Sequence, residues 1–401
     1  MAGLVAVPVV SLRPRKAQPF FNRHPWVFAG AIAKVAGNPQ AGDEVVVKSH
    51  EGKFVGRGLF NPVSKIRVRL YSWNEEEALN DEFWSEKIGN AIQLRERHVV
   101  RPSTDSYRVV FSESDGVSGL TVDRYGEWLM VQLTSLALSL RRECLFDVLA
   151  ERLKPKGIWL RTEKGIAEAE GLELMDGLVR GVEPPRPMTI QENGLRFGVD
   201  LAEGQKTGAF LDQRDNRRAA AAYCQGAKML DLFSYCGGFG VTAAALGGAA
   251  SVTCVDSSQP ALDAGLRNAE VNAVADRMTF VRSDAFKFLE EAISRSEQFD
   301  VVVLDPPKMA RRQAGIEQAL RGYHSLNVLA ASVLKPGGIL VTCSCSGRVS
   351  RSDFEMMLAQ TGTSIRRSIK VLETRGPAAD HPTSPNCPES DYLKCFICAI
   401  D

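Results

Sequence analysis

Short apolar runs alternate with longer amphipathic stretches over the second half of the chain. Each run is four or five residues long and rich in Val, Leu and Ile, as expected of strands buried on both faces. The predicted strands are residues 229–233, 251–255, 278–281, 300–304 and 339–342. The stretches between them predict helices at residues 260–271, 285–293 and 313–334. This alternation predicts βαβ units and a doubly wound parallel sheet.

The first 73 residues have a different pattern, in which short β-rich segments are separated by turn residues. We predict strands at residues 44–48, 53–59 and 65–71, because Gly-Asp, His-Glu-Gly and Asn-Pro turn signals lie between them. This spacing predicts a small β-barrel. We expect Trp26 and Phe28 to pack in its core rather than to stack on bases.

Residues 74–185 predict a small α+β domain. The segment "DEFWSEKIGNAIQLRERH" predicts a helix, and residues 120–123 and 128–134 predict a hairpin around Tyr125-Gly126-Glu127. A helix at residues 138–153 and a strand at 157–162 complete a ββαβ order. The proline-rich "VEPPRPM" ends this part, and Asn193-Gly194 predicts a hairpin at the start of a third domain, residues 186–401.

Composition is that of a soluble globular protein of two or three domains. Neither a stretch long enough to span a membrane nor a convincing secretory signal is visible. The nine cysteines are irregularly spaced, and no two pairs have zinc-site spacing, so we expect reduced thiols, a cytoplasmic location and no metal.

Charge is distributed unevenly along the chain. Residues 1–70 hold 11 Lys and Arg against 3 Asp and Glu, a balance of +8, so a total of +1 leaves −7 for the rest. A basic front module suggests contact with a phosphate backbone. Charge alone does not distinguish this from a solvated face that protects sheet edges.

Acidic residues lie at the ends of the first four predicted parallel strands, and a glycine turn follows the first of them. Asp231 precedes Gly237, Gly238 and Gly240 in "LDLFSYCGGFGVTAAAL", the layout of a site for a nucleotide-type cofactor. The turn lacks the full G-x-G-x-x-G spacing, which argues against a dinucleotide. We expect Asp256 to bind ribose hydroxyls and Asp284 to meet an adenine amine, while Asp305 ends the fourth strand.

The segment "GGILVTCSCSGRVS" contains two cysteines one residue apart. Side chains alternate along a strand, so Cys343 and Cys345 share a face. Cys343 lies within the strand and is expected to be a small buried side chain. Cys345 lies where Ser346-Gly347 ends the strand, at the edge where reacting groups gather in open α/β sheets, so it is the candidate nucleophile.

These motifs resemble a known family. "DLFSYCGGFG", "VDSS", "SDAF" and "LDPPK" are similar to the class I S-adenosylmethionine-dependent methyltransferases over residues 186–401. "GQKTGAFLDQRDNR", "RGYHSLN", "TCSCSG" and "DHP" resemble the cytosine-5 methyltransferases of large-subunit ribosomal RNA that carry an N-terminal PUA domain. "NRHPWVFAGAI" and the strands after it resemble that RNA-binding PUA domain over residues 10–73.

The resemblance implies a three-part chain: a PUA-like barrel (1–73), a central α+β domain (74–185) and a Rossmann-like α/β methyltransferase domain (186–401). It implies S-adenosylmethionine as donor, ribosomal RNA as partner, Cys345 as the nucleophile that adds to carbon 6 of the pyrimidine, and Asp305 as acceptor for the base. The implied cofactor contacts are Asp231, Phe233, Gly237, Asp256, Asp284 and Asp305, with Lys206, Phe210 and Asp212 at the methionine end. For Phe210, core packing is the alternative.

One position departs from the family pattern. Many RNA cytosine-5 methyltransferases have a second cysteine directly after "PP", where this chain has Lys308. The base that removes the carbon-5 proton is therefore open, with Asp380 or His381 as candidates unless their segment is only a turn. The departure also leaves open a uracil-5 or exocyclic-amine methyltransferase, and an inactive RNA-binding protein is a further alternative. A homodimer is an option that the sequence does not decide.

Overall fold

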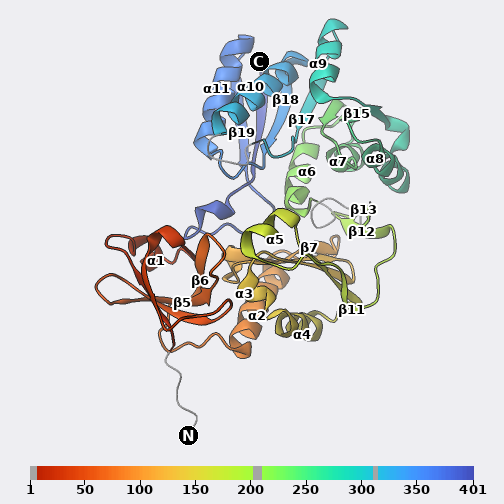
Figure 1. The fold of residues 1–401 in the computed structure, drawn as a ribbon. Coiled ribbons are helices and arrows are strands. Elements are labelled where there is room, and N and C mark those ends of the chain that lie inside the picture. Colours follow the sequence, from red (N-terminus) through yellow and green to blue (C-terminus); the bar gives the residue numbers. More distant parts are fainter. Residues whose placement is uncertain (1–6, 202–209, 310–314) are drawn as a thin grey trace. The chain divides into compact units, whose positions relative to one another are not determined.

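The computed structural model describes residues 7–201, 210–309 and 315–401, and the chain divides into two compact units (Figure 1). The first consists of Met1–Met188, Val199–Ala209 and Asp380–Ser390. The second consists of Thr189–Gly198, Phe210–Ala379 and Asp391–Asp401.

The first unit begins with a six-stranded sheet in the order β2-β6-β5-β4-β1-β3. The predicted strands at residues 44–48, 53–59 and 65–71 are confirmed within a residue or two. Val10, Val27, Val47 and Val68 are fully buried and form the centre of its core. The elements are β1 (Val9–Leu12), α1 (Gln18–Phe21), β2 (Trp26–Phe28), β3 (Ile32–Ala36), β4 (Glu44–Lys48), β5 (Phe54–Phe60) and β6 (Ile66–Ser72).

A five-stranded sheet in the order β11-β10-β9-β8-β7 follows in the same unit. The predicted helix is α2 (Asp81–His98), and the predicted hairpin is β8 (Leu120–Tyr125) with β9 (Trp128–Leu133). The predicted ββαβ order was incomplete, because β7 and β11 add a strand at each edge of the sheet. Within the sheet, β9 pairs parallel with β10. The predicted helix at 138–153 is two helices. The remaining elements are β7 (Ser106–Phe111), α3 (Leu136–Ser139), α4 (Arg142–Leu153), β10 (Gly157–Arg161), α5 (Lys164–Glu170) and β11 (Asp176–Gly181).

The two sheets of the first unit share buried contacts. Tyr71 of β6 packs edge-to-face on Trp84 of α2, with ring centroids 4.9 Å apart, and both side chains are buried. Trp26 donates from Nε1 to Glu113 Oε1 at 2.9 Å and is partly buried. Phe28 is 46% exposed, so the expectation that it packs in the core was wrong. Trp26 and Phe28 lie two residues apart and share one face of β2, whereas Val27 between them faces the core and is fully buried.

The second unit is built on a seven-stranded sheet in the order β16-β15-β14-β17-β18-β20-β19. The first five strands in this order are parallel, which confirms the doubly wound prediction, and β20 and β19 add an antiparallel edge. The strands are β14 (Lys228–Leu232), β15 (Ser251–Asp256), β16 (Met278–Arg282), β17 (Phe299–Leu304), β18 (Leu334–Ser344), β19 (Ile369–Arg375) and β20 (Lys394–Ile400). The Asn193-Gly194 hairpin is confirmed as β12 (Met188–Glu192) and β13 (Leu195–Val199).

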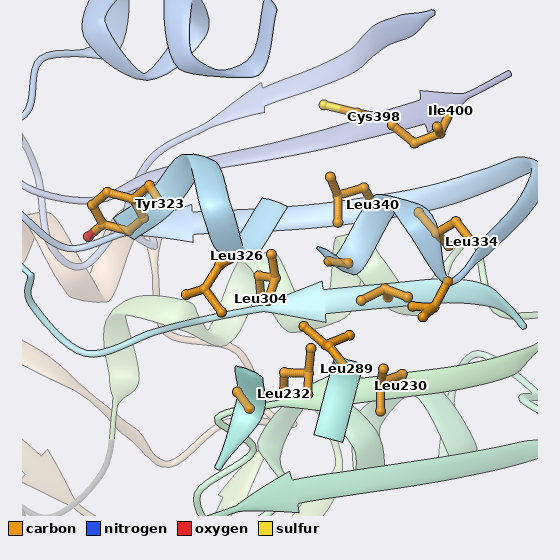
Figure 2. Close-up of a cluster of buried hydrophobic side chains, with 14 of the residues drawn as sticks. Leu230, Leu232, Leu289, Leu304, Tyr323, Leu326, Leu334, Leu340, Cys398 and Ile400 are labelled. Atoms are coloured by element: carbon orange, nitrogen blue, oxygen red, sulfur yellow. The ribbon is translucent and has the colours of Figure 1, made fainter. Parts of the chain in front are cut away.

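Helices cover both faces of this sheet. On one face α10 contacts α9 and α11, and on the other α7 contacts α6 and α8. The first face buries leucines from β14, β17 and β18 against α9 and α10 (Figure 2). The helices are α6 (Arg214–Ala221), α7 (Gly238–Ala245), α8 (Gln259–Val271), α9 (Ala285–Ser294), α10 (Ile316–Ser332) and α11 (Arg351–Ile365). This core fixes the strand ends that carry the candidate site.

Across the described ranges, no helix combines the length and apolar character that a bilayer crossing requires.

Candidate active site

The carboxyl edge of the parallel sheet brings together the acidic residues that the strand pattern singled out. Asp231 lies in β14, Asp256 ends β15, and Asp305 directly follows β17. Because these strands are parallel neighbours, their ends meet at one edge. Cys345 directly follows the last residue of β18, so the structure places it at the same edge.

The glycine turn between β14 and α7 has an unusual backbone. Phe233, Tyr235 and Gly237 have positive φ angles of 61°, 48° and 76°. Such values are rare for residues with side chains and cluster at ligand sites. The amide of Tyr235 donates to Asp256 Oδ2 at 2.9 Å, so the neighbouring strand end holds the loop in this shape.

Asp231 is fully buried beneath the loop. Its Oδ2 accepts the backbone N–H of Gly240 at 2.9 Å, which ties the first turn of α7 to β14. Burial raises the pKa of Asp231 to about 7, and the nearby carboxylate of Asp305 acts in the same direction, while the Gly240 hydrogen bond opposes it. Asp231 therefore stabilises the loop through its hydrogen bond to the first turn of α7.

Asp256 and Asp284 occupy the ends of the next two strands. Asp256 is partly exposed, and its two oxygens accept the amides of Tyr235 and Ser258, each at 2.9 Å. Asp284 Oδ1 accepts the amides of Phe286 and Lys287 and so caps the N-terminus of α9. The contact of Asp284 with an adenine amine stays a prediction.

Residues before α6 pack against the loop. Phe210 stacks edge-to-face on Tyr235 with ring centroids 5.5 Å apart. Asp212 is buried, and its Oδ2 accepts the hydroxyl of Tyr392 at 2.5 Å. Lys206, the third residue expected at the methionine end, lies outside the described residues. Phe210 thus borders the glycine turn, and its contact with the cofactor stays a prediction.

The two cysteines of "TCSCSG" have different surroundings. Cys343 is fully buried in β18 and lies opposite Cys395 of β20. Hydrogen bonding to Cys395 and burial raise the pKa of the Cys343 thiol well above its ordinary value. Cys345 is partly exposed, and its Sγ lies 3.9 Å from the carbonyl oxygen of Pro306. Only Cys345 combines the strand-end position with exposure.

Asp305 has a partner that the sequence pattern did not identify. Its Oδ1 accepts Gln213 Nε2 at 3.0 Å, and the side-chain oxygen of Gln213 accepts Asn216 Nδ2 at 2.7 Å. Gln213 lies in the motif "GQKTGAFLDQRDNR", which is the signal that could have singled it out. Asp305 does not act as a helix N-cap, since residues 306–309 directly after it are not helical.

A second group missed from the sequence supports the segment around Cys345. The hydroxyl of Tyr323 on α10 accepts Ser344 Oγ at 3.0 Å and lies 3.1 Å from Ser346 Oγ. Figure 2 shows Tyr323 at the arrowhead end of the strands, opposite Leu334. These bonds hold the residues on both sides of Cys345, and Tyr323 lies in the motif "RGYHSLN".

Comparison with family models identifies two parts of the chain. Residues 10–73 match a PUA-like domain, and residues 178–383 match the S-adenosylmethionine-dependent methyltransferase model, which covers half of the chain. The chain belongs to the S-adenosylmethionine-dependent methyltransferase family. The resemblance seen in the sequence, the Rossmann-like fold and the cofactor are thereby confirmed.

Relatives of this methyltransferase include proteins named Ribosomal RNA large subunit methyltransferase I. The protein from Vibrio parahaemolyticus is 40% identical over 382 residues, and that from Erwinia tasmaniensis is 39% identical over 380 residues. Both alignments cover 94% of this chain and 96% of the relative.

Solved structures share the fold. A methyltransferase from Streptococcus mutans superimposes with a TM-score of 0.83 at 20% identity, covering 98% of this chain and 99% of that chain. The crystal structure of SMU.776 complexed with SAH gives a TM-score of 0.84 at 21% identity, with the same coverage.

The residues of this methyltransferase fit S-adenosylmethionine. Ser234 Oγ is buried in the glycine turn and has no hydrogen-bond partner among the described residues. A Cβ at Gly240 would lie 2.7 Å from Cys254 Sγ, so only glycine lets α7 approach β15 this closely. Each carboxylate oxygen of Asp256 has a lone pair beyond the one that holds the loop, so the group can also accept a ribose hydroxyl.

The candidates for the proton-removing base lie in the first unit. Asp380 Oδ2 accepts the amide of Arg108 at 2.8 Å, and the carbonyl oxygen of Asp380 accepts Arg95 Nη2 at 2.8 Å. His381 is buried and its ring lies 5.4 Å from that of Phe111. These contacts give both residues a structural role within that unit, and their part in catalysis stays a prediction.

Proposed function

We propose that the protein methylates carbon 5 of a cytosine in large-subunit ribosomal RNA, with Cys345 as the nucleophile. The observation that carries this proposal is the partly exposed thiol of Cys345, placed at the same sheet edge as the glycine turn and Asp305. The relatives named Ribosomal RNA large subunit methyltransferase I and the PUA-like match support the choice of RNA.

Carbon 5 of a pyrimidine is too weak a nucleophile to take a methyl group directly. Addition of the Cys345 thiolate to carbon 6 gives an enamine whose carbon 5 is nucleophilic. S-adenosylmethionine supplies the electrophilic methyl group. Loss of the carbon-5 proton then restores the double bond to carbon 6 and expels the thiolate, which regenerates the enzyme.

Asp305 favours cytosine over uracil. A carboxylate only accepts hydrogen bonds, and cytosine presents a 4-amino donor where uracil presents a carbonyl oxygen. Gln213 holds Asp305 Oδ1 at 3.0 Å and so fixes the direction of the carboxylate. Uracil could meet this carboxylate only through its N3–H, and its 4-carbonyl oxygen would need a donor from another group.

The proposal is tested with ribosomal RNA fragments that contain 5-fluorocytosine. Fluorine cannot leave as the proton does, so the wild type should be trapped as a covalent protein–RNA adduct on Cys345. Cys345→Ala should form no adduct and lose methyl transfer while still binding S-adenosylmethionine. Cys343→Ala is the matched control: it should stay active and lose at most about 1–2 kcal/mol of stability through a small cavity.

Three outcomes would overturn the proposal. An adduct on Cys343 would place the nucleophile inside the strand. Trapping with 5-fluorouracil but not with 5-fluorocytosine would make the enzyme a uracil methyltransferase. An active Cys345→Ala variant would favour methylation of an exocyclic amine, which needs no covalent step.

A further inference from the structure

A buried lysine lies beside the proposed nucleophile. Lys394 is the first residue of β20, pairs in register with Ser344, and is 1% exposed. Its Nζ donates to the carbonyl oxygens of Ser346 at 2.8 Å and Tyr392 at 2.9 Å. Because Ser346 directly follows Cys345, these bonds fix the ammonium next to the segment that carries the thiol.

Lys394 has no carboxylate within ion-pair distance among the described residues. Burial lowers the pKa of Lys394 to about 8, and the charges of Asp391 and Cys345 act against this lowering. Asp391 lies 3.7 Å from Arg351 Nη2, so it also faces another cation. A buried ammonium is costly unless a negative charge lies nearby, and the thiolate form of Cys345 would supply one.

Other titratable groups face this pair from several elements. Burial raises the pKa of Tyr323 on α10, which keeps its hydroxyl neutral. Among the described residues, the other charged groups acting on Lys394 are Lys308 after β17, Arg351 on α11 and Asp391 before β20, and Asp305 directly precedes Pro306, whose carbonyl oxygen Cys345 contacts. Among the cations that the structure describes, only Lys394 is buried and bonded to the backbone next to Cys345.

We propose that Lys394 is a positioning residue that favours the thiolate of Cys345. Its ammonium holds the Ser346 carbonyl and places a fixed positive charge near the sulfur. The S–H bond of Cys345 breaks, the proton goes to solvent, and the sulfur keeps the electron pair with which it adds to carbon 6. The role in methyl transfer rests on the proposed function, whereas the ionisation of the thiol does not.

The test is the pH profile of Cys345 alkylation by iodoacetamide, followed by peptide mass spectrometry on the full chain without RNA. Lys394→Gln keeps N–H donors for the two carbonyls but removes the charge. Its profile should move upward by about one pH unit, with a roughly tenfold slower reaction below the midpoint. Lys394→Arg keeps the charge and should keep the wild-type profile.

The matched control is Lys335→Gln at the opposite end of β18, where Nζ lies 2.6 Å from Asp300 Oδ1. It should not move the profile. An unchanged profile in Lys394→Gln would mean that Lys394 only donates hydrogen bonds to the two carbonyl oxygens and has no effect on the thiol. That result would overturn the proposal. If Lys394→Gln does not fold, the alkylation profile of the wild type is the test. A midpoint of that profile at or above about 8.5, the value for an unperturbed thiol, also overturns the proposal.

The proposal and the proposed function fail separately. A shifted alkylation profile without any fluorocytosine adduct would retain the lysine–thiol pair and reject cytosine-5 methylation. An adduct on Cys345 with an unshifted profile would retain the methylation and reject the role of Lys394.

Discussion

Asp231 and Asp256 stand near the ends of neighbouring strands, yet their surroundings give them different tasks. Asp231 is 1% exposed and bonds to the amide of Gly240 beneath the glycine turn. Asp256 is partly exposed and holds the turn from the side. A carboxylate that reaches solvent can also reach a ligand, so only Asp256 is expected to contact the ribose directly.

Asp231 should make stability depend on pH. Its folded pKa of about 7 lies above the ordinary value of 3.8, so between these pH values the folded chain binds a proton that the unfolded chain has lost. Stability from this group therefore falls as pH rises from about 4 to 7 and is constant above. Asp231→Asn keeps an acceptor for Gly240 and should be more stable than wild type at pH 8, by on the order of 4 kcal/mol.

Urea unfolding at pH 5 and pH 8 measures this difference. The gain from Asp231→Asn should be about a third as large at pH 5 as at pH 8, where it is full. Asp263→Asn, which changes an exposed carboxylate on α8, should follow the wild type at both values. An equal effect of Asp231→Asn at both pH values would mean that the buried carboxylate does not titrate in this range.

Asp256→Ala should weaken cofactor binding. Charge-assisted hydrogen bonds contribute roughly 1.5–3 kcal/mol each, so we expect an increase of about ten- to a hundredfold in the Kd for S-adenosylmethionine. Isothermal titration measures the Kd, and a thermal melt checks that the loop remains folded without its acceptor. Asp263→Ala serves as the control, and an unchanged Kd in Asp256→Ala would remove this residue from the cofactor site.

At the scale of elements, the sequence predicts those strands that carry a local pattern of apolar residues. All five parallel strands are confirmed, and four of them, β14, β15, β17 and β18, are apolar runs whose faces are largely buried. β16 is an edge strand that is largely exposed or half-buried, and its apolar residues Met278, Phe280 and Val281 still predicted it. Other exposed strands carry a weaker signal. β19 and β11 are largely exposed or half-buried along their length and were not predicted, since no buried face imposes a pattern on them.

Contacts between distant elements explain what the sequence could not predict in the candidate site. Gln213 and Asp305 are 92 positions apart, and Lys394 and Ser346 are 48 apart. The pattern predicts which strand ends share an edge, but not which side chains from other segments turn toward them. In the sequence, Lys394 looks like an ordinary strand residue. Only the pairing of β20 with β18 shows that it lies opposite Ser344, beside Cys345.

At the scale of the whole molecule, the basic first module is part of a larger packed unit. Arg69 of β6 is buried and lies 3.3 Å from Glu170 and 3.4 Å from Glu113, both outside the PUA-like segment. Deleting residues 1–73 would remove the Arg69 guanidinium from both carboxylates and the Tyr71 ring from Trp84. RNA binding by this module is therefore better tested with surface substitutions than with a truncation.

Exposed groups around the connection from β2 to β3 suit that test. The carbonyl oxygen of Lys65 accepts the amide of Ala29, and the carbonyl oxygen of Ala31 accepts the amide of Arg13. The segments around Arg13 and Lys65 therefore both contact this connection. Lys16 and Lys65 are exposed, as is Phe28. Cations beside an exposed ring offer a backbone contact together with a surface on which a base can stack.

Lys16→Gln combined with Lys65→Gln should weaken RNA binding and flatten its salt dependence. Removing one lysine–phosphate interaction should reduce the slope of log K against log salt by about 0.7–0.9. Phe28→Ala should weaken binding because a base can no longer stack on the ring, an effect of about 1–3 kcal/mol, without changing that slope.

Fluorescence anisotropy at several salt concentrations separates the two effects, with S-adenosylmethionine affinity as the check that the second unit is intact. Arg295→Gln combined with Lys335→Gln removes two charges from the amino edge of the second unit's sheet and should leave the slope unchanged. If the Lys16 and Lys65 substitutions leave both affinity and slope as in the wild type, these lysines form a solvated face. The excess charge of residues 1–70 would then have another role.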